Sequence, residues 1–130
     1  MKFDVIFIDG LHHYDQAQRD LINSLKFLKK NGIILIHDML PRNPLEERVP
    51  QKQPSWTGDV WKLGVELLKS KTNFIIANID HGVGIIKPLN KNEYITLNDE
   101  LNDKRFQTFK KFLPKFPIVS LEESFKFIDN

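Results

Sequence analysis

The sequence predicts an α/β fold in which a mainly parallel sheet ends in an antiparallel hairpin, with helices on both faces of the sheet. Three observations predict it. Short, almost unbroken apolar runs rich in β-branched residues are typical of strands buried on both faces. Stretches with an apolar residue every three or four positions lie between these runs and indicate helices. Short polar links separate the two kinds of segment.

The chain opens with a strand, a helix and a second strand. The first strand is expected at Phe3–Ile8 and the second at residues 33–36. Between them, residues 15–30 carry one apolar stripe, with Asp15 and Gln18 as an expected capping box and a basic, glycine-stopped end. This order predicts a strand–helix–strand unit whose two strands lie side by side.

A loop, a helix and a hairpin are expected next. Residues 39–55 hold four of the seven prolines and few apolar side chains, which predicts a long loop of the functional or mobile kind. Residues 56–71 predict a helix capped by Ser55 or Thr57. Residues 74–79 and 83–87 predict two strands joined by a turn at 80–82.

The C-terminal segment is predicted to be helical. Residues 102–113 form one expected helix, which ends at prolines, and residues 121–128 form another. Ser120 and Glu123 are an expected capping box for the second helix. Most phenylalanines of this segment are expected in the core. We expect a single α/β domain over residues 1–130, with residues 89–130 as its helical tail.

Composition narrows the class of protein. The net charge of the 130 residues is only +2, which gives no electrostatic support for nucleic-acid binding. The chain has no cysteine, which excludes disulfides, thiolate zinc sites and cysteine nucleophiles and fits a cytoplasmic protein. Its apolar runs are far shorter than the roughly 20 residues of a membrane-spanning helix, and no signal peptide is expected.

Chemically versatile side chains follow both predicted parallel strands. Asp9, His12 and His13 come after the first strand, and His37 and Asp38 follow the second. Ligands bind beyond the carboxyl ends of strands in open α/β sheets, and neighbouring strands would bring both groups to one rim. Carboxylates with imidazoles suit a divalent metal: oxygen-rich sets favour magnesium or manganese, whereas imidazoles favour zinc or iron.

A purely structural interpretation of these residues stays open. Asp9 and Asp38 could simply accept hydrogen bonds from loop amides at the strand ends. His13 fits a solvated loop residue, and His81, in the expected hairpin turn, fits a structural role.

At these residues the chain resembles a known family. FDVIFIDGLHHYDQAQRDL followed by NGIILIHDM is similar to strands four and five of class I S-adenosylmethionine-dependent methyltransferases. The nearest branch contains metal-dependent O-methyltransferases of antibiotic and sugar biosynthesis, which read Asp-Gly-x-His-x-Tyr after strand four and Gly-Gly-x-x-x-x-x-Asp around strand five. The matching positions are Asp9, Gly10, His12, Tyr14, Gly32 and Asp38, with Asn31 in place of a glycine.

The resemblance covers residues 3–88 and implies a partial Rossmann-like sheet, with the family's strands in the order 4-5-7-6. Residues 1–88 would then be the C-terminal half of such a methyltransferase. The family's glycine-rich cofactor loop has no counterpart among the six glycines, because Gly82 and Gly84 fall in the expected hairpin. Residues that bind S-adenosylmethionine therefore stay unassigned.

The resemblance also implies roles for the site residues. Asp9, His37 and Asp38 stand at the positions that hold magnesium in relatives, with His37 replacing an acid. The metal would lower the pKa of a substrate hydroxyl, and His12, beside Asp9 in the catalytic set, would act as general base. We expect O-methyl transfer to a small hydroxylated or sugar-like molecule. A non-catalytic binding or assembly module is the alternative, and a metal-dependent hydrolase is the least supported possibility because no nucleophile is recognisable.

The implied topology has a consequence for assembly. Strand four pairs with strand one in the family, so Phe3–Ile8 is expected to be an exposed apolar sheet edge. Such edges pair readily with other chains, and we therefore expect a homodimer through this strand. In the alternative, the phenylalanine-rich tail folds back to cover the bare surface.

Overall fold

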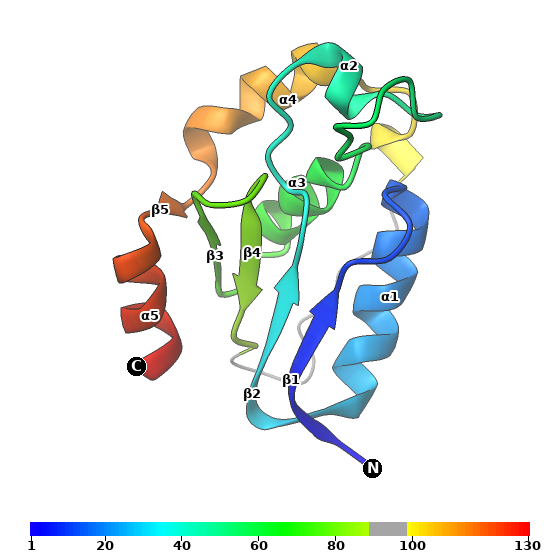
Figure 1. The fold of residues 1–130 in the computed structure, drawn as a ribbon. Coiled ribbons are helices and arrows are strands. Elements are labelled where there is room, and N and C mark those ends of the chain that lie inside the picture. Colours follow the sequence, from blue (N-terminus) through cyan, green and yellow to red (C-terminus); the bar gives the residue numbers. More distant parts are fainter. Residues whose placement is uncertain (89–98) are drawn as a thin grey trace.

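The computed structural model describes residues 1–88 and 99–130 and is built around a five-stranded sheet (Figure 1). Its strand order is β1-β2-β4-β3-β5. The strands are β1 Phe3–Ile8, β2 Leu28–Ile36, β3 Phe74–Ala77, β4 Val83–Ile86 and β5 Ile118–Val119. β1 and β2 are parallel, β4 is antiparallel to both β2 and β3, and β5 is parallel to β3. The predicted α/β fold and the order of its first four strands are confirmed, and β5 is a strand that the sequence did not predict.

Helix α1, Tyr14–Phe27, connects β1 to β2 but ends earlier than residue 30, where the sequence placed its end. β2 begins at once, at Leu28, which pairs with Phe3 and lies buried in the core. Sheet pairing and burial of Leu28 therefore outweigh the helix propensity of the two lysines that follow. The pairing of β2 with β1 is irregular between Leu28 and Ile33. Asn31, in a left-handed conformation with φ 66°, lies in this irregular part of β2, where the sequence predicted the end of the helix.

The start of α1 is held by a residue distant in sequence. The side chain of His13, at the N-cap position, makes no capping bond, and Asp59 Oδ1 instead accepts a 2.7 Å hydrogen bond from the Tyr14 backbone amide. The expected capping box of Asp15 and Gln18 is wrong. The Gln18 side chain is buried and donates to both carboxylate oxygens of Glu66 at 2.9 and 2.8 Å.

A buried polar network joins α1 to α3, Trp61–Lys69. Glu66 accepts from the hydroxyl of Tyr14 as well as from Gln18. Lys62, fully buried, donates to Asp59 Oδ2 at 2.9 Å and to the backbone carbonyl of Asn102 at 3.1 Å. Buried charges are tolerated only when paired in this way, so the network fixes the start of α1 relative to α3.

The core lies on one face of the sheet, between the strands and helices α1 and α3. Strand pairing puts alternate residues of β1, β2, β3 and β4 on this face, and they are buried there. These residues are Ile8, Ile34, Ile36, Phe74, Ile76 and Ile86. On the opposite face Val5 and Phe7 of β1 are 54% and 56% exposed, so no described segment covers that part of the sheet.

The hairpin is confirmed, whereas the preceding helix starts later than predicted. α3 begins at Trp61 rather than near residue 56, because Thr57 uses its hydroxyl and amide to bond the carbonyl of Glu46. The helix ends at Lys69, and Lys71 follows with φ 56°. Within the predicted loop lies one short helix, α2, Pro44–Glu47, capped by the side chain of Asn43.

The C-terminal segment packs mainly against α3 and β3. α4, Phe106–Phe112, starts later than predicted, and α5, Leu121–Asp129, is capped by Ser120 as predicted. Two 3₁₀ turns, Asp99–Leu101 and Leu113–Lys115, flank α4. Phe109 and Phe116 are buried in the core, and Phe109 packs edge-on against Trp61. The tail therefore leaves the exposed face of β1 bare, and the expected boundary at residue 88 falls next to residues 89–98, outside the described residues.

In the part of the chain that the structure describes, the helices are too short or too polar to cross a membrane.

Candidate functional site

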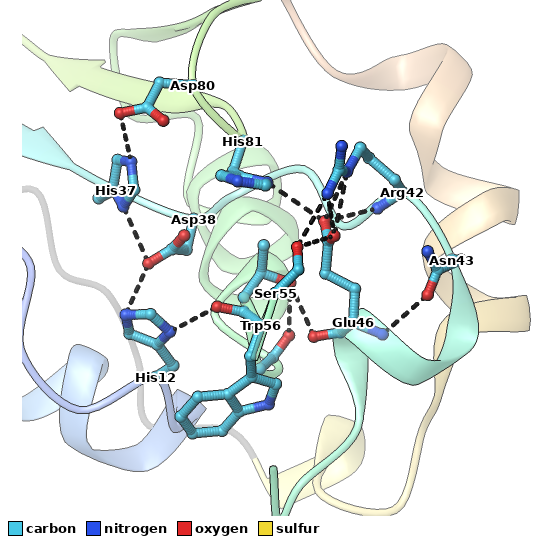
Figure 2. Close-up of polar contacts among 12 residues, drawn as sticks. His12, His37, Asp38, Arg42, Asn43, Glu46, Ser55, Trp56, Asp80 and His81 are labelled. Carbon is cyan, nitrogen blue, oxygen red and sulfur yellow. Dashed lines mark hydrogen bonds and ion pairs between the residues drawn. The ribbon is translucent and has the colours of Figure 1, made fainter. Parts of the chain in front are cut away.

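The predicted site residues lie together at the carboxyl edge of the sheet. β1 ends at Ile8 and is followed by Asp9, and β2 ends at Ile36 and is followed by His37 and Asp38. Ile8 and Ile36 are direct partners in the parallel pairing, so the two strand ends share one rim, as the sequence predicted. His12 lies in the link between β1 and α1 and points at Asp38 (Figure 2).

Asp38 is the centre of this group. Its side chain is 3% exposed, and its Oδ2 lies 2.8 Å from His12 Nε2 and 2.9 Å from His37 Nδ1. Asp9, 42% exposed, has its Oδ1 3.7 Å from His12 Nε2 and 3.4 Å from His37 Nδ1. Two carboxylates and two imidazoles therefore converge here, and Asp9 is the most exposed of the four.

His12 is held in one orientation by the segment before α3. Its Nδ1 lies 2.9 Å from the backbone carbonyl of Trp56, and its ring lies against the Trp56 indole, with 4.9 Å between ring centroids. A carbonyl oxygen only accepts hydrogen bonds, so Nδ1 carries the proton. The neutral imidazole consequently presents the lone pair of Nε2 to Asp38 and Asp9.

The tight packing of His12 also requires a glycine. Gly58 has φ 64°, and a Cβ at this position would lie 1.7 Å from the backbone oxygen of His12. Only glycine allows this approach. The segment that supplies the Trp56 carbonyl is thereby pressed against the residue that it orients.

Burial and neighbouring charges shift the pKa values of Asp38 and His37 in opposite directions. Burial raises the pKa of Asp38 above its ordinary value, and the charges of His12 and His37 oppose the rise without cancelling it. For His37, burial lowers the pKa, but the charge of Asp38 and the hydrogen bond with Asp80 outweigh burial, so the pKa is raised. Positive charge is thus favoured at this point of the fold.

Two buried atoms of the site, Asp38 Oδ2 and His37 Nδ1, make no contact of hydrogen-bond geometry with the described residues, although Asp38 Oδ2 lies within ion-pair distance of both imidazoles. The two atoms are close to each other, but their relative orientation is not that of a hydrogen bond. A buried polar atom left in this state costs about 1–3 kcal/mol. A cation between the converging donor atoms would remove the cost.

Among the described residues, one donor set is compact enough to hold a metal ion. Asp9, His12 and Asp38 each offer a ligand atom, and these atoms lie within 4.8 Å of one another. Two carboxylate oxygens and one imidazole nitrogen fit a divalent cation. This set contains His12, which the resemblance assigned to catalysis, while His37 lies beside it.

His13 and His81 lie outside the set of Asp9, His12 and Asp38. The His13 ring meets the Trp56 indole edge-on at 5.8 Å between centroids. His81 Nδ1 lies 3.3 Å from Glu46 Oε1, where it helps to join the hairpin turn to the loop.

The loop between β2 and α3 is held by one buried carboxylate (Figure 2). Glu46, fully buried, accepts from the Arg42 guanidinium at 2.8 Å and from Ser55 Oγ at 2.9 Å. Its backbone carbonyl accepts from the amides of Thr57 and Gly58 at 2.9 and 3.1 Å. The long loop is thus closed on itself next to His12.

Sequence reasoning missed two side chains that complete the surroundings of the site. Asp80, in the β3–β4 turn, has its Oδ2 3.0 Å from His37 Nε2. Glu46 organises the loop although it stands in a segment with no periodic signal. The predicted topology could have placed Asp80 near the site. β3 runs in the same direction as β2, so the turn that follows β3 lies at the same edge of the sheet as the end of β2.

Comparison with known proteins bears on the N-terminal part of this site. Residues 1–39, which contain β1, α1, β2 and the residues from Asp9 to Asp38, match a protein family described as Methyltransferase domain. This segment is methyltransferase-like. No curated protein matches the chain.

The methyltransferase-like segment contains the compact donor set in full, because Asp9, His12 and Asp38 all lie within residues 1–39. The glycines of the hairpin have another explanation, because a Cβ at Gly82 or Gly84 would collide with Leu40 or Met39. They serve packing, and the described residues assign no site to the cofactor.

Proposed function

We propose that this chain functions in S-adenosylmethionine-dependent O-methyl transfer to a small hydroxylated or sugar-like molecule, assisted by a divalent cation at Asp9, His12 and Asp38. The observation that carries the proposal is Asp38 Oδ2, a buried carboxylate oxygen that makes no contact of hydrogen-bond geometry with the described residues and lies in a compact donor set. The methyltransferase match over residues 1–39 supports the reaction class.

The donor set supports Mg²⁺ or Mn²⁺ before other ions. Two of the three donors are carboxylates, the hard oxygen ligands that these cations prefer. Mg²⁺ keeps several of its waters or substrate oxygens when it is bound by few protein groups, which suits a site half open at Asp9. The imidazole of His12 shifts the metal preference of the donor set toward Mn²⁺ or Zn²⁺. The binding of Mg²⁺, Mn²⁺ and Zn²⁺ should therefore be compared.

A cation bound here would lower the pKa of a coordinated substrate hydroxyl and so favour the nucleophilic alkoxide. The chain's own residues provide placement. Asp38 supplies a fixed, buried charge, whereas the more exposed Asp9 lies where a substrate would approach. The Trp56 indole lies against the His12 ring and adds an apolar surface beside the donor set. Methyl transfer needs in-line positioning above all, and these contacts restrict the acceptor.

His12 can take one of two roles in this scheme. Its Nε2 lone pair either binds the cation or accepts the proton of the substrate hydroxyl, because one lone pair cannot do both. The compact donor set favours the first role. The resemblance to metal-dependent methyltransferases favours the second.

Transfer of a labelled methyl group tests the proposed function. The chain is incubated with methyl-labelled S-adenosylmethionine and a panel of hydroxylated small molecules, with Mg²⁺ or with a chelator. We expect label in an acceptor only when the cation is present. Equal transfer with chelator would contradict metal assistance, and no transfer to any acceptor would contradict methyl transfer by this chain.

The second candidate is a non-catalytic binding or assembly module, and the exposed edge and face of β1 favour it. Calorimetric titration with S-adenosylmethionine separates the two functions. Heat of binding is expected for the methyltransferase, whereas a chain that binds cation but gives no heat with S-adenosylmethionine fits the module.

We also propose that β1 pairs with β1 of a second copy, giving a homodimer. Within the described residues the outer edge of β1 has no strand partner. Phe3, Val5 and Phe7 are symmetric about Val5, so antiparallel self-pairing would oppose Phe3 with Phe7 and Val5 with itself. All three side chains are about half exposed, at 46%, 54% and 56%.

A further inference from the structure

The turn between β3 and β4 brings a carboxylate to the site that the sequence patterns did not include. Asp80 Oδ2 lies 3.0 Å from Nε2 of His37, and its side chain is 71% exposed. On the other side of the same imidazole, Nδ1 lies 2.9 Å from Asp38 Oδ2 and 3.4 Å from Asp9 Oδ1. His37 therefore lies between the turn and the proposed cation site (Figure 2).

Backbone bonds fix the turn in this place. The amides of Met39 and Leu40 donate to the carbonyls of Gly82 and His81 at 3.0 and 2.8 Å. Gly82, with φ 85°, packs so closely that a Cβ would lie 2.5 Å from Leu40 Cγ. Asp80 itself has φ 41°, a conformation that aspartate tolerates better than most residues. The segment after β2 and the hairpin turn thus form one unit that presents Asp80 to His37.

The partners of His37 define its proton. An ionised carboxylate only accepts hydrogen bonds, so the contact with Asp80 requires a proton on Nε2. The neutral imidazole then carries its lone pair on Nδ1, which is buried and has no hydrogen-bond partner among the described residues. Nδ1 lies 2.9 Å from Asp38 Oδ2 and 3.4 Å from Asp9 Oδ1, and a lone pair so close to two carboxylate oxygens is unfavourable unless positive charge lies near them.

We propose that Asp80 is a positioning residue that holds His37 as its Nε2-protonated tautomer and directs the Nδ1 lone pair at the cation between Asp9 and Asp38. The cation in this statement rests on the proposed function, whereas the tautomer does not. Carboxylates that orient a ligating histidine through its second nitrogen strengthen metal binding by about 10- to 100-fold. His37 would then be a further ligand beside Asp9, His12 and Asp38, and the affinity for the cation would depend on a turn distant in sequence.

Two variants separate the effect of the Asp80 carboxylate from the effect of placing glycine at a position with positive φ. Asp80→Gly removes the side chain and keeps the left-handed conformation free of strain. Lys71→Gly is the matched control, because Lys71 is also an exposed residue with positive φ, 56°, and lies after α3, away from the site. Both variants are made in the full chain with ¹⁵N-labelled histidine.

The first measurement is the ¹⁵N spectrum of the metal-free protein at a pH at which His37 is neutral. We expect the proton of His37 on Nε2 in the wild-type chain and in Lys71→Gly, and a mixture of tautomers in Asp80→Gly. The second measurement is calorimetric titration with Mn²⁺. We expect Asp80→Gly to bind about 10- to 100-fold more weakly than the wild-type chain, and Lys71→Gly to bind equally well.

The two measurements fail in distinguishable ways. A wild-type His37 with its proton on Nδ1 overturns the proposal, as does an Asp80→Gly chain that keeps both tautomer and Mn²⁺ affinity. If Asp80→Gly changes the tautomer while no form of the chain binds Mn²⁺, the action of Asp80 on His37 is upheld. The cation of the proposed function is then overturned.

Discussion

Asp38 combines three features that are individually unfavourable. It has φ 66°, its carboxylate is almost fully buried, and Oδ2 lacks a hydrogen-bond partner among the described residues. A non-glycine residue in this conformation is uncommon, and strain of this kind gathers at functional sites. The nearest imidazole nitrogens, His12 Nε2 at 2.8 Å and His37 Nδ1 at 2.9 Å, balance the carboxylate only when a proton or a cation lies between them and it. A bound cation would complete that balance.

The role of His12 is open to direct test by substitution. If His12 is a ligand, His12→Ala should weaken Mn²⁺ binding by about tenfold or more, since one of three donors is lost. His13→Ala is the control, because His13 touches the same indole but lies outside the donor set. Calorimetry gives both affinities. Unchanged affinity in His12→Ala, with methyl transfer lost, would instead make His12 the general base.

At the scale of elements, the loop between β2 and α3 depends on the ionised state of Glu46. Burial favours a higher pKa for this carboxyl, but hydrogen bonds from Arg42 and Ser55 outweigh burial and hold the pKa below its ordinary value of 4.5. A lowered folded-state pKa means that ionised Glu46 stabilises the fold above pH 4.5, and that this contribution is lost as the pH falls through the folded-state pKa.

Glu46→Gln should therefore be destabilising in a pH-dependent way. We expect a loss of about 1–2 kcal/mol in the free energy of unfolding at neutral pH, moderated because Arg42 is largely exposed. The difference from the wild-type chain should shrink as the pH is lowered below 4.5. Urea unfolding over a pH series measures it. Asp4→Asn, which breaks only an exposed pair with Lys29, should cost less than about 0.5 kcal/mol.

The contact between Gly58 and His12 predicts a second effect at this scale. In Gly58→Ala the new Cβ meets the His12 backbone and adds strain at positive φ, so we expect a loss of about 2–4 kcal/mol and weaker cation binding. Gly10→Ala is the comparison, because the nearest atom of the described residues to its new Cβ is Asp20 Oδ2, at an ordinary contact distance of 3.6 Å. Equal stability of the two variants in urea would contradict the packing described for Gly58.

The elements that the sequence predicted well are those with a strong local pattern. The unbroken apolar run of β1, the hairpin of β3 and β4, and the Ser120 cap of α5 were each predictable from neighbouring residues. The starts of α1 and α3 were not, because Asp59 and Glu46 decide them through contacts with residues distant in sequence. The site shows the same division. Asp9 and Asp38 follow strands and were found, whereas Asp80 reaches the site only through the hairpin's placement.

At the scale of the whole molecule, the described residues leave the outer edge and one face of β1 exposed to solvent. Exposed sheet edges with apolar side chains promote association. If β1 edges pair, Val5→Lys should give monomers, because it places two like charges opposite each other at the symmetry axis. Phe125→Lys is the control, since Phe125 is exposed to a similar extent, 57%, on α5. Light scattering after size exclusion gives the mass. A wild-type chain that stays monomeric at high concentration would contradict the dimer.

The central claim is that Asp9, His12 and Asp38 hold a divalent cation, and calorimetric titration of the chelator-treated chain tests it most directly. Mg²⁺, Mn²⁺ and Zn²⁺ are titrated into the wild-type chain, into Asp38→Asn, which tolerates the positive φ, and into the exposed control Asp15→Asn. We predict one binding site in the wild-type chain and in Asp15→Asn, and its loss in Asp38→Asn. No binding of any of the three cations by the wild-type chain, or equal binding by Asp38→Asn, would contradict the claim.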